Sequence, residues 1–301
     1  MAEDIAGLIR AAVRDRRTAM ALPVTSEHPA AGRLDLTDLD IERGFGTSPL
    51  DEPVLRCLQY MHDVEHHTVC YLRDLLVTSA HRDPEITEFL TVWNYEEHWH
   101  GVAIGRVLAA HGRPAGDRRV GELRDSQPWT ERLRPVGFAL GSVAFPDLTA
   151  VSLVWGAINE WCTQAGYGQL ARRAGHPLLG ELLRRIMRQE GRHISFYSTA
   201  GRTRLERSRA ARRLTRFALQ RLWRPVGHGV VPEHETAFLV RYLFGGPGGA
   251  EVAARIDRNV SRLPGLGGLA VVGTAVERYQ RVPRAEAIRA RSGRLLTSDL
   301  Q

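Results

Sequence analysis

Apolar residues return every three or four positions through most of the chain, which is the spacing of one face of an α-helix. Strict apolar–polar alternation, which is typical of a half-buried strand, is scarce. The pattern therefore predicts an all-α fold with long helices at about 52–80, 84–112, 147–174 and 177–200. Further helices are predicted at 1–20, 202–224, 234–244 and 250–260, and from 269 onward.

Glycine and proline mark the breaks between these helices. Residues 21–51 are rich in Pro, Gly, Asp and Thr and are predicted to be irregular, whereas residues 113–146 are predicted to form a long connection. We expect a single domain with three parts. These are an N-terminal helix with an irregular segment, a four-helix core, and a C-terminal helical extension packed on that core, at residues 1–51, 52–200 and 201–301.

Each of the four long helices carries one glutamate on its otherwise apolar face. These glutamates are Glu65, Glu97, Glu160 and Glu190. An ionised carboxylate on a buried face is costly unless it is paired or bound to a metal ion. Their shared position therefore indicates a buried polar site rather than four separate surface groups.

Two of these glutamates precede a histidine by three residues, in Glu97-His-Trp-His100 and Glu190-Gly-Arg-His193. Residues at i and i+3 share one helix face, so each pair can hold a metal ion from one side. The order repeats along the chain as a single glutamate followed by Glu-x-x-His. The step is 32 residues from Glu65 to Glu97 and 30 residues from Glu160 to Glu190.

Ferritin-like carboxylate proteins use this ligand set, projected from four facing helices. We therefore predict a ferritin-like four-helix bundle core with additional flanking helices. Carboxylates with one imidazole per metal suit iron or manganese better than zinc or copper. The predicted cofactor is two iron ions, with manganese as an alternative at one site. The predicted ligands are Glu65, Glu97, His100, Glu160, Glu190 and His193.

Three segments around these residues carry a family resemblance. Trp93-Asn-Tyr-Glu-Glu-His-Trp-His100-Gly is similar to the Trp-x-x-Glu-Glu-x-x-His-Gly of the acyl-acyl-carrier-protein desaturases, the soluble stearoyl-type fatty acid desaturases. Glu190-Gly-Arg-His193 matches the second Glu-x-x-His of that family. Ile158-Asn-Glu160-Trp-Cys-Thr163 resembles its third-helix ligand segment, in which a threonine follows the glutamate by three. The similarity spans roughly residues 52–290 and is loose outside the two Glu-x-x-His helices.

The resemblance implies a di-iron, dioxygen-dependent desaturase of fatty acid metabolism that inserts a double bond into a fatty acyl thioester. It also implies an acyl carrier protein or other acyl thioester as partner, a ferredoxin-like electron donor and a homodimer. Thr163 would be the hydroxyl beside the dioxygen site. The chain has Gln189 where the family commonly has an aspartate, at a position associated with electron delivery.

Two other functions fit the same residues. One is a di-iron N-oxygenase or hydroxylase that acts on a non-lipid substrate, and the other is a non-catalytic iron-binding or carrier-protein-binding module. For a desaturase, a dry apolar channel would hold the acyl chain. Its candidate lining is Trp93, Gly156, Ala157 and Tyr167, for which the alternative is ordinary core packing.

The chain carries a net charge of +7 and contains no lysine, so its positive charge comes from arginine. A dense arginine stretch offers a surface for an acidic carrier protein, although a solvated helix face is the alternative. Its members are Arg202, Arg204, Arg207, Arg209, Arg212, Arg213, Arg216, Arg221 and Arg224. Since no zinc-finger spacing or aromatic-interleaved basic motif occurs, nucleic acid is not an expected partner.

The cysteines and the apolar runs bear on the compartment. Cys57, Cys70 and Cys162 form a sparse, odd set without a CxxC motif, which favours a reducing environment. No apolar run approaches the roughly 20 residues that a membrane span needs, and no signal peptide is recognised at the N-terminus. We therefore expect a cytoplasmic protein without a membrane span.

Overall fold

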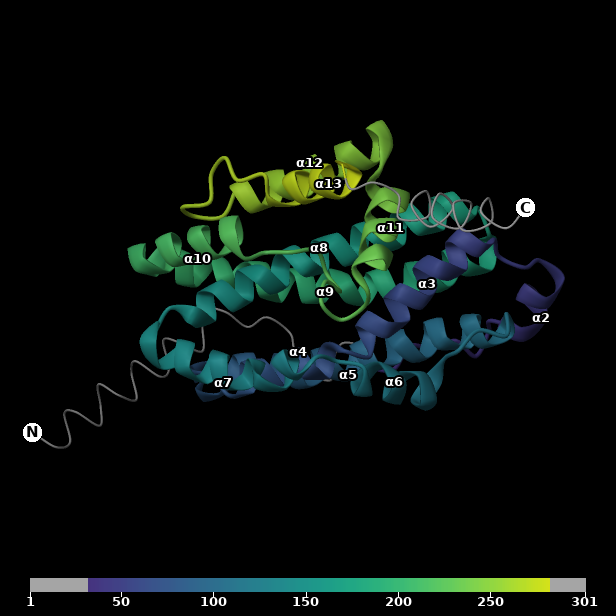
Figure 1. The fold of residues 1–301 in the computed structure, drawn as a ribbon, viewed down its shortest axis with the longest axis horizontal. Helices are drawn as coiled ribbons and strands as arrows, with labels where there is room; N and C mark the ends of the chain where they lie inside the picture. The colour runs from purple at the N-terminus through teal and green to yellow at the C-terminus, as the bar shows by residue number, and fades with distance from the viewer. Residues whose placement is uncertain (1–31, 282–301) are drawn as a thin grey trace, which may run out of the picture. The chain divides into compact units, whose positions relative to one another are not determined.

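The computed structural model describes residues 32–281, and this part of the chain is all-α, without a strand (Figure 1). The helix expected at 1–20 lies outside the described residues, as does the end of the expected C-terminal extension. The elements are α2 (Ile41–Thr47), α3 (Glu52–Glu65), α4 (Thr68–Leu76), the 3₁₀ helix η1 (Ser79–Arg82), α5 (Pro84–Ala110), α6 (Gly116–Asp125), α7 (Trp129–Ala144), α8 (Leu148–Ala174), α9 (Pro177–Arg207), α10 (Arg209–Arg221), α11 (Glu233–Phe244), α12 (Gly246–Ser261) and α13 (Val271–Arg281).

The long helices begin and end at local signals in the sequence. Proline occupies the first turn of α5 and of α9, where a missing N–H costs nothing. The carboxylate of Asp83 caps α5 by accepting hydrogen bonds from the N–H groups of Glu85 and Ile86, at 3.2 and 3.3 Å. Helix α8 ends at Gly175, whose φ of +58° lies in the left-handed region that favours glycine.

The helix expected at 52–80 is interrupted directly after Glu65 and continues as α4 and η1. The N–H of His67 donates to the carbonyl of Val64, and the hydroxyl of Thr68 donates to the carbonyl of Glu65 at 2.6 Å. These bonds close a tight turn in place of the helical pattern. Glu65 is consequently the last residue of α3.

The connection expected at 113–146 is mostly helical, because it forms α6 and α7. Pro135 lies inside α7 and cannot donate to the carbonyl of Glu131, four residues earlier. The guanidinium of Arg73 on α4 donates to that carbonyl instead, at 3.3 Å. The hydrogen bond from Arg73 therefore lets α7 continue through Pro135, although a proline inside a helix ordinarily predicts a break.

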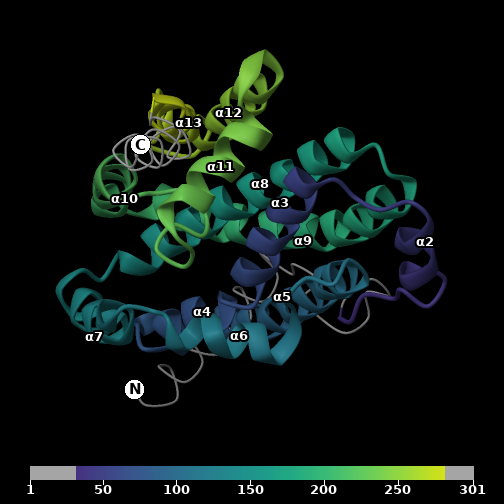
Figure 2. The same cartoon turned by 45° about the vertical axis from the view of Figure 1, so that its right-hand side comes forward.

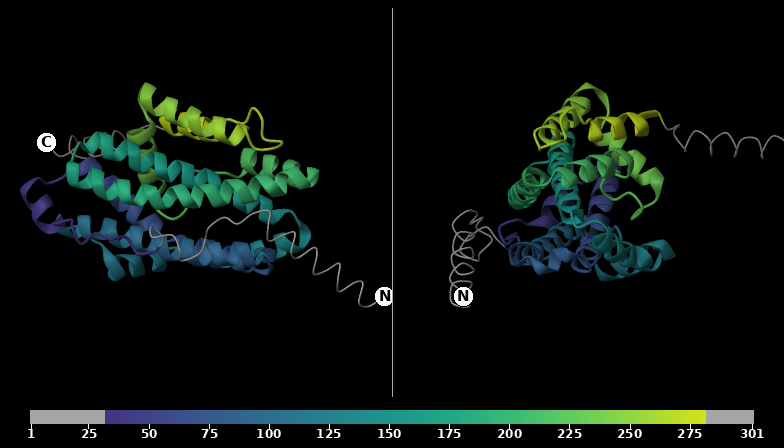
Figure 3. Two further views of the ribbon diagram at one scale, coloured as in Figure 1. Left: turned by 180° about the vertical axis from the view of Figure 1, so that it is seen from behind. Right: turned by 90° about the vertical axis from the view of Figure 1, so that its left-hand side faces the viewer.

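Two helix pairs form the centre of the described structure. Helix α3 packs against α5 and α8 packs against α9, while α5 also contacts α9 and α3 contacts α8. In Figures 1 and 2, α8 and α9 run side by side between a layer with α5, α6 and α7 and a layer with α12 and α13. The view from behind in Figure 3 shows the same order of layers. Helix α11 packs against α3, α8 and α13.

The inward faces of the four central helices are apolar. Leu58, Ile104, Ile158 and Ile186 come from α3, α5, α8 and α9 respectively, and all four are fully buried. They enclose the polar groups that the same helices carry. In the described part of the chain, no helix combines the length and the apolar character needed to cross a membrane.

Candidate metal centre

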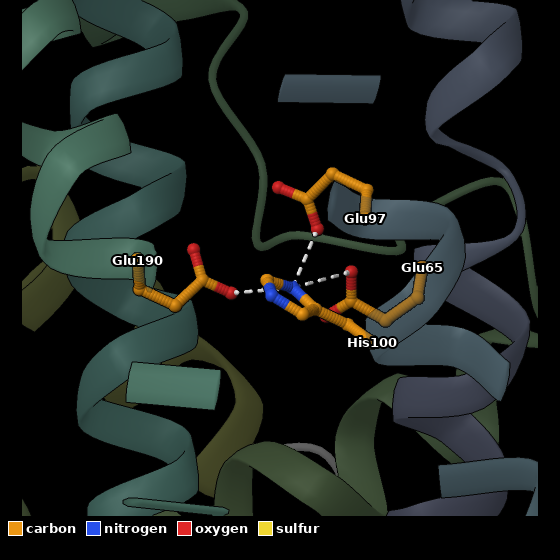
Figure 4. A group of neighbouring side chains, drawn as sticks. All are labelled: Glu65, Glu97, His100 and Glu190. Carbon is orange, nitrogen blue, oxygen red and sulfur yellow. Dashed lines mark hydrogen bonds and ion pairs between the residues drawn. The ribbon is translucent and has the colours of Figure 1, made fainter. Parts of the chain in front are cut away.

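The six residues predicted as ligands converge between the four central helices. Each is at most 5% exposed. Their donor atoms form two overlapping groups, and within each group the atoms lie within 4.8 Å of one another. Each group contains three carboxylates and one imidazole, the combination proposed from the sequence. The groups are Glu65, Glu97, His100 and Glu190, shown in Figure 4, and Glu97, Glu160, Glu190 and His193.

Glu97 and Glu190 belong to both groups and divide their oxygens between the two imidazoles. Oε2 of Glu97 lies 3.3 Å from Nδ1 of His100, and Oε1 lies 3.3 Å from Nδ1 of His193. Oε1 of Glu190 lies 3.4 Å from Nδ1 of His100, and Oε2 lies 3.1 Å from Nδ1 of His193. Both carboxylates could therefore contribute ligand atoms to either group.

Glu65 and Glu160 each belong to one group and are oriented by an aromatic side chain. The hydroxyl of Tyr167 donates to Oε1 of Glu65, and Nε1 of Trp93 donates to Oε1 of Glu160 at 3.0 Å. The second oxygen of each carboxylate lies 4.0 Å from the Nδ1 of the imidazole in its own group. The two ends of the cluster are therefore built alike.

Burial and the repulsion between neighbouring carboxylates shift the pKa values of the cluster residues. Burial, together with the charge of Glu97, raises the pKa of Glu65 well above its ordinary value. Burial and the charge of Glu190 do the same to the pKa of Glu160. Although burial opposes it, hydrogen bonding to Glu190 and Glu97 raises the pKa of His100 to about 9. Protons thus offset the carboxylate charge here, and bound cations would replace those protons.

One oxygen of the cluster is left without a hydrogen bond. Oε1 of Glu190 is fully buried and accepts no hydrogen bond within the described residues, although Nδ1 of His100 lies 3.4 Å away. A buried carboxylate oxygen without a partner is costly. A metal ion bound by this group would satisfy it, and carboxylate and imidazole donors suit iron or manganese. The residues therefore fit the cofactor expected from the sequence.

Two residues behind the histidines complete the site. Oε2 of Glu96 lies 2.8 Å from Nε2 of His193, and Oε1 of Gln189 lies 2.8 Å from Nε2 of His100. The role of Glu96 was missed by the sequence analysis, although a second glutamate beside Glu97 was a signal for it. Glu96 directly precedes Glu97 on α5 and contacts His193 on α9. Gln189 directly precedes Glu190 on α9 and contacts His100 on α5.

Thr163 lies in a different setting from the six clustered residues. It lines an apolar cavity of about 70 Å³ between α3, α8, α11 and α13, and Glu65 lies in the same lining. The four residues proposed as channel lining are not part of this cavity wall. Trp93 and Tyr167 orient cluster carboxylates, Ala157 is fully buried, and Gly156 leaves room for the ring of Tyr197.

No family model matches this sequence, and a search of curated proteins gave no match. The class of the protein is therefore defined by its own structure. The chain is an all-α protein in which buried glutamate and histidine side chains from four helices form groups that could hold a metal ion.

Proposed function

We propose that this chain is a di-iron, dioxygen-dependent oxidoreductase of the acyl-acyl-carrier-protein desaturase type, with a ferritin-like core and a cytoplasmic location. The observation that carries the proposal is the sharing of Glu97 and Glu190 between two groups of ligands. Glu65 and Glu160 would be the terminal carboxylates of the two iron positions. His100 and His193 would bind through Nδ1, the nitrogen that faces the carboxylates.

A pair of iron ions supplies the oxidising power needed to attack an unactivated C–H bond. The protein's own residues have other tasks. Tyr167 and Trp93 hold the terminal carboxylates in place, and the surrounding apolar side chains exclude water from the site. Following the family resemblance, Thr163 would supply the hydroxyl beside the dioxygen site, and it lines the same cavity as Glu65.

The cavity beside Glu65 supports an apolar substrate, because most of its lining is aliphatic or aromatic. Met61 of α3, Gly166 of α8 and Leu243 of α11 form part of this wall. A volume of about 70 Å³ is well below the roughly 300–1,000 Å³ of a typical ligand pocket. We therefore propose that a fatty acyl chain enters by displacing wall side chains.

An acidic acyl carrier protein would dock on the outer face of α10. Arg209, Arg213 and Arg221 are exposed on this helix, and Phe217, between them at four-residue steps, is 58% exposed. Other arginines of the same stretch have structural tasks, since Arg216 donates to the carbonyls of Gly265 and Gly267. A mixed basic and apolar row fits an acidic helical partner. A ferredoxin-like protein would supply the electrons.

The test is to load the purified protein with iron, reduce it, and incubate it with an acyl-acyl-carrier protein and dioxygen. We expect two iron ions per chain and a product lighter by two hydrogens by mass spectrometry. Glu97→Ala should lose both metal ions, because Glu97 belongs to both groups. Iron binding with no oxygen consumption would favour the binding-module alternative. Oxygen consumption only with a non-lipid substrate would favour the N-oxygenase or hydroxylase.

We also propose a homodimer, with α7 at the contact between the copies. No residue of α7 is buried in the described chain. Trp129, Leu133, Val136, Leu140 and Val143 are each more than half exposed and follow one another at alternating steps of four and three. This is the spacing of a helix-pairing seam, and a two-fold axis would place the same row opposite itself.

A further inference from the structure

The two cluster histidines are supported from behind by a reciprocal exchange between α5 and α9. Glu96 of α5 holds Nε2 of His193 on α9, and Gln189 of α9 holds Nε2 of His100 on α5, both at 2.8 Å. Both supporting side chains are buried. The exchange leaves Nδ1 of each imidazole facing the carboxylates. One support is a carboxylate, however, and the other is a neutral amide.

The backbone of a single residue joins these two supports. The N–H of Gly32 donates to Oε1 of Glu96 at 2.7 Å, and Nε2 of Gln189 donates to the carbonyl of Gly32 at 2.8 Å. Gly32 has a φ of +102°, which L side chains rarely adopt. An added Cβ would meet only Cε1 of Tyr95, at 4.0 Å. Glycine is therefore required by the backbone conformation and not by crowding.

The carbonyl of Gly32 decides which end of the Gln189 amide faces the histidine. A carbonyl only accepts, so the NH₂ end of the amide points to Gly32 and Oε1 points to His100. Nε2 of His100 must then carry a hydrogen, so Nδ1 is the nitrogen that can exchange its proton for a cation. A carboxylate at position 189 would have no hydrogen to offer Gly32. The structure thus gives a reason for glutamine at this position.

We propose that the Gly32 peptide is a positioning element that holds both imidazoles in the Nδ1-binding form through Glu96 and Gln189, and that it keeps the two metal positions unequal. A carboxylate behind a ligating histidine makes the imidazole a stronger donor than a neutral amide does. The position that contains His193 should therefore bind a divalent cation more tightly than the position that contains His100. This inference rests on the proposed metal centre.

The test is a titration of metal-free protein with Co²⁺, followed by its visible absorption. The wild type should bind two equivalents with separable affinities. Gly32→Ala should weaken both equivalents by about 10-fold to 100-fold, the usual effect of losing an outer partner of a metal ligand. Gln189→Leu should weaken the equivalent held by His100 more than the other, since Gln189 contacts His100 directly and reaches Glu96 only through Gly32.

Gly112→Ala is the matched control. Gly112 also has a positive φ, +67°, and nothing lies within 4 Å of an added Cβ. It should therefore show a similar loss of thermal stability with unchanged Co²⁺ affinities. In the Zn²⁺-loaded wild type, NMR should detect imidazole Nε2–H protons on His100 and His193, and these should be lost or broadened in Gly32→Ala.

The possible results separate this inference from the metal proposal. If the wild type binds no Co²⁺, both are overturned. If the wild type binds two equivalents and Gly32→Ala keeps the affinities of Gly112→Ala, only the role of Gly32 is overturned. If the two wild-type equivalents bind with equal affinity, or if Gln189→Leu weakens the tighter equivalent as much as the weaker one, the inequality between the two positions is overturned.

Discussion

At the scale of single residues, the geometry of the cluster depends on which atom of each side chain already has a hydrogen-bond partner outside it. Tyr167 donates a hydrogen bond to Oε1 of Glu65, and Trp93 donates one to Oε1 of Glu160. The remaining oxygen of each carboxylate therefore faces the cluster. The two histidines are oriented in the same way, because Nε2 of His100 contacts Gln189 and Nε2 of His193 contacts Glu96. These outer contacts aim the side chains that would bind metal.

Tyr167→Phe tests whether the hydroxyl of Tyr167 orients the carboxylate of Glu65, because the variant lacks only that oxygen atom. The free energy of unfolding should fall by about 1 kcal/mol, the usual net value of a hydrogen bond. The affinity for one metal equivalent should fall as well, because Glu65 is no longer oriented. Calorimetric titration with Co²⁺ measures that affinity.

The control is Tyr60→Phe, which removes a buried hydroxyl that donates to the carbonyl of Val226 rather than to a cluster carboxylate. It should cost similar stability and leave the metal affinities unchanged. Equal metal binding by Tyr167→Phe and Tyr60→Phe would show that the phenol of Tyr167 does not position Glu65.

At the scale of elements, the turn between α3 and α4 is a weak point in acid. His67 is 1% exposed, and neither of its ring nitrogens has a hydrogen-bond partner in the described chain. Burial, together with the nearby charges of Arg134, Arg73 and Arg124, lowers its pKa to about 4. The unfolded chain therefore takes up a proton below its ordinary pKa of 6.5, whereas the folded chain does not until about pH 4.

His67→Leu should consequently remove part of the acid sensitivity of the metal-free protein. Since the folded-state pKa is depressed, the histidine costs stability progressively as pH falls from 6.5 to 4. The difference in unfolding free energy between His67→Leu and wild type should grow across this interval and be constant above it. Urea denaturation at a series of pH values measures it. A difference independent of pH would contradict the assignment.

Elements also show where sequence reasoning succeeds. The periodic helices that carry Glu97, Glu160 and Glu190 were predicted because their apolar rows are long and regular. The outer contacts of Gly32 and Gln189 could not be predicted, because they join segments far apart in the chain. Helix α7 was missed for the same reason, since its proline is accommodated by an arginine of α4.

At the scale of the whole molecule, the exposed apolar row of α7 predicts how two copies of the chain associate. Leu140→Glu would place a charge in the middle of the proposed seam, where Leu140 is 67% exposed. The variant should fold normally and shift the protein from dimer to monomer by at least 10-fold in dissociation constant, on the order of 1.4 kcal/mol. Analytical ultracentrifugation measures the shift.

Leu222→Glu is the control for a general effect of charge, because Leu222 is 60% exposed on a different surface, at the end of α10. Its association should equal that of the wild type. If the wild type is monomeric at all concentrations, or if Leu140→Glu and Leu222→Glu associate equally, α7 is not the dimer contact.

The position of Glu65 at the end of α3 makes the cluster depend on both central helix pairs. Glu97 and His100 come from α5, which pairs with α3, whereas Glu160, Glu190 and His193 come from the pair α8 and α9. Glu65 joins them only when α3 has docked and the short turn after it has closed. The two ligand groups therefore exist only where the two helix pairs meet, and a loss of packing between the pairs would separate Glu65 and Glu97 from Glu160 and Glu190.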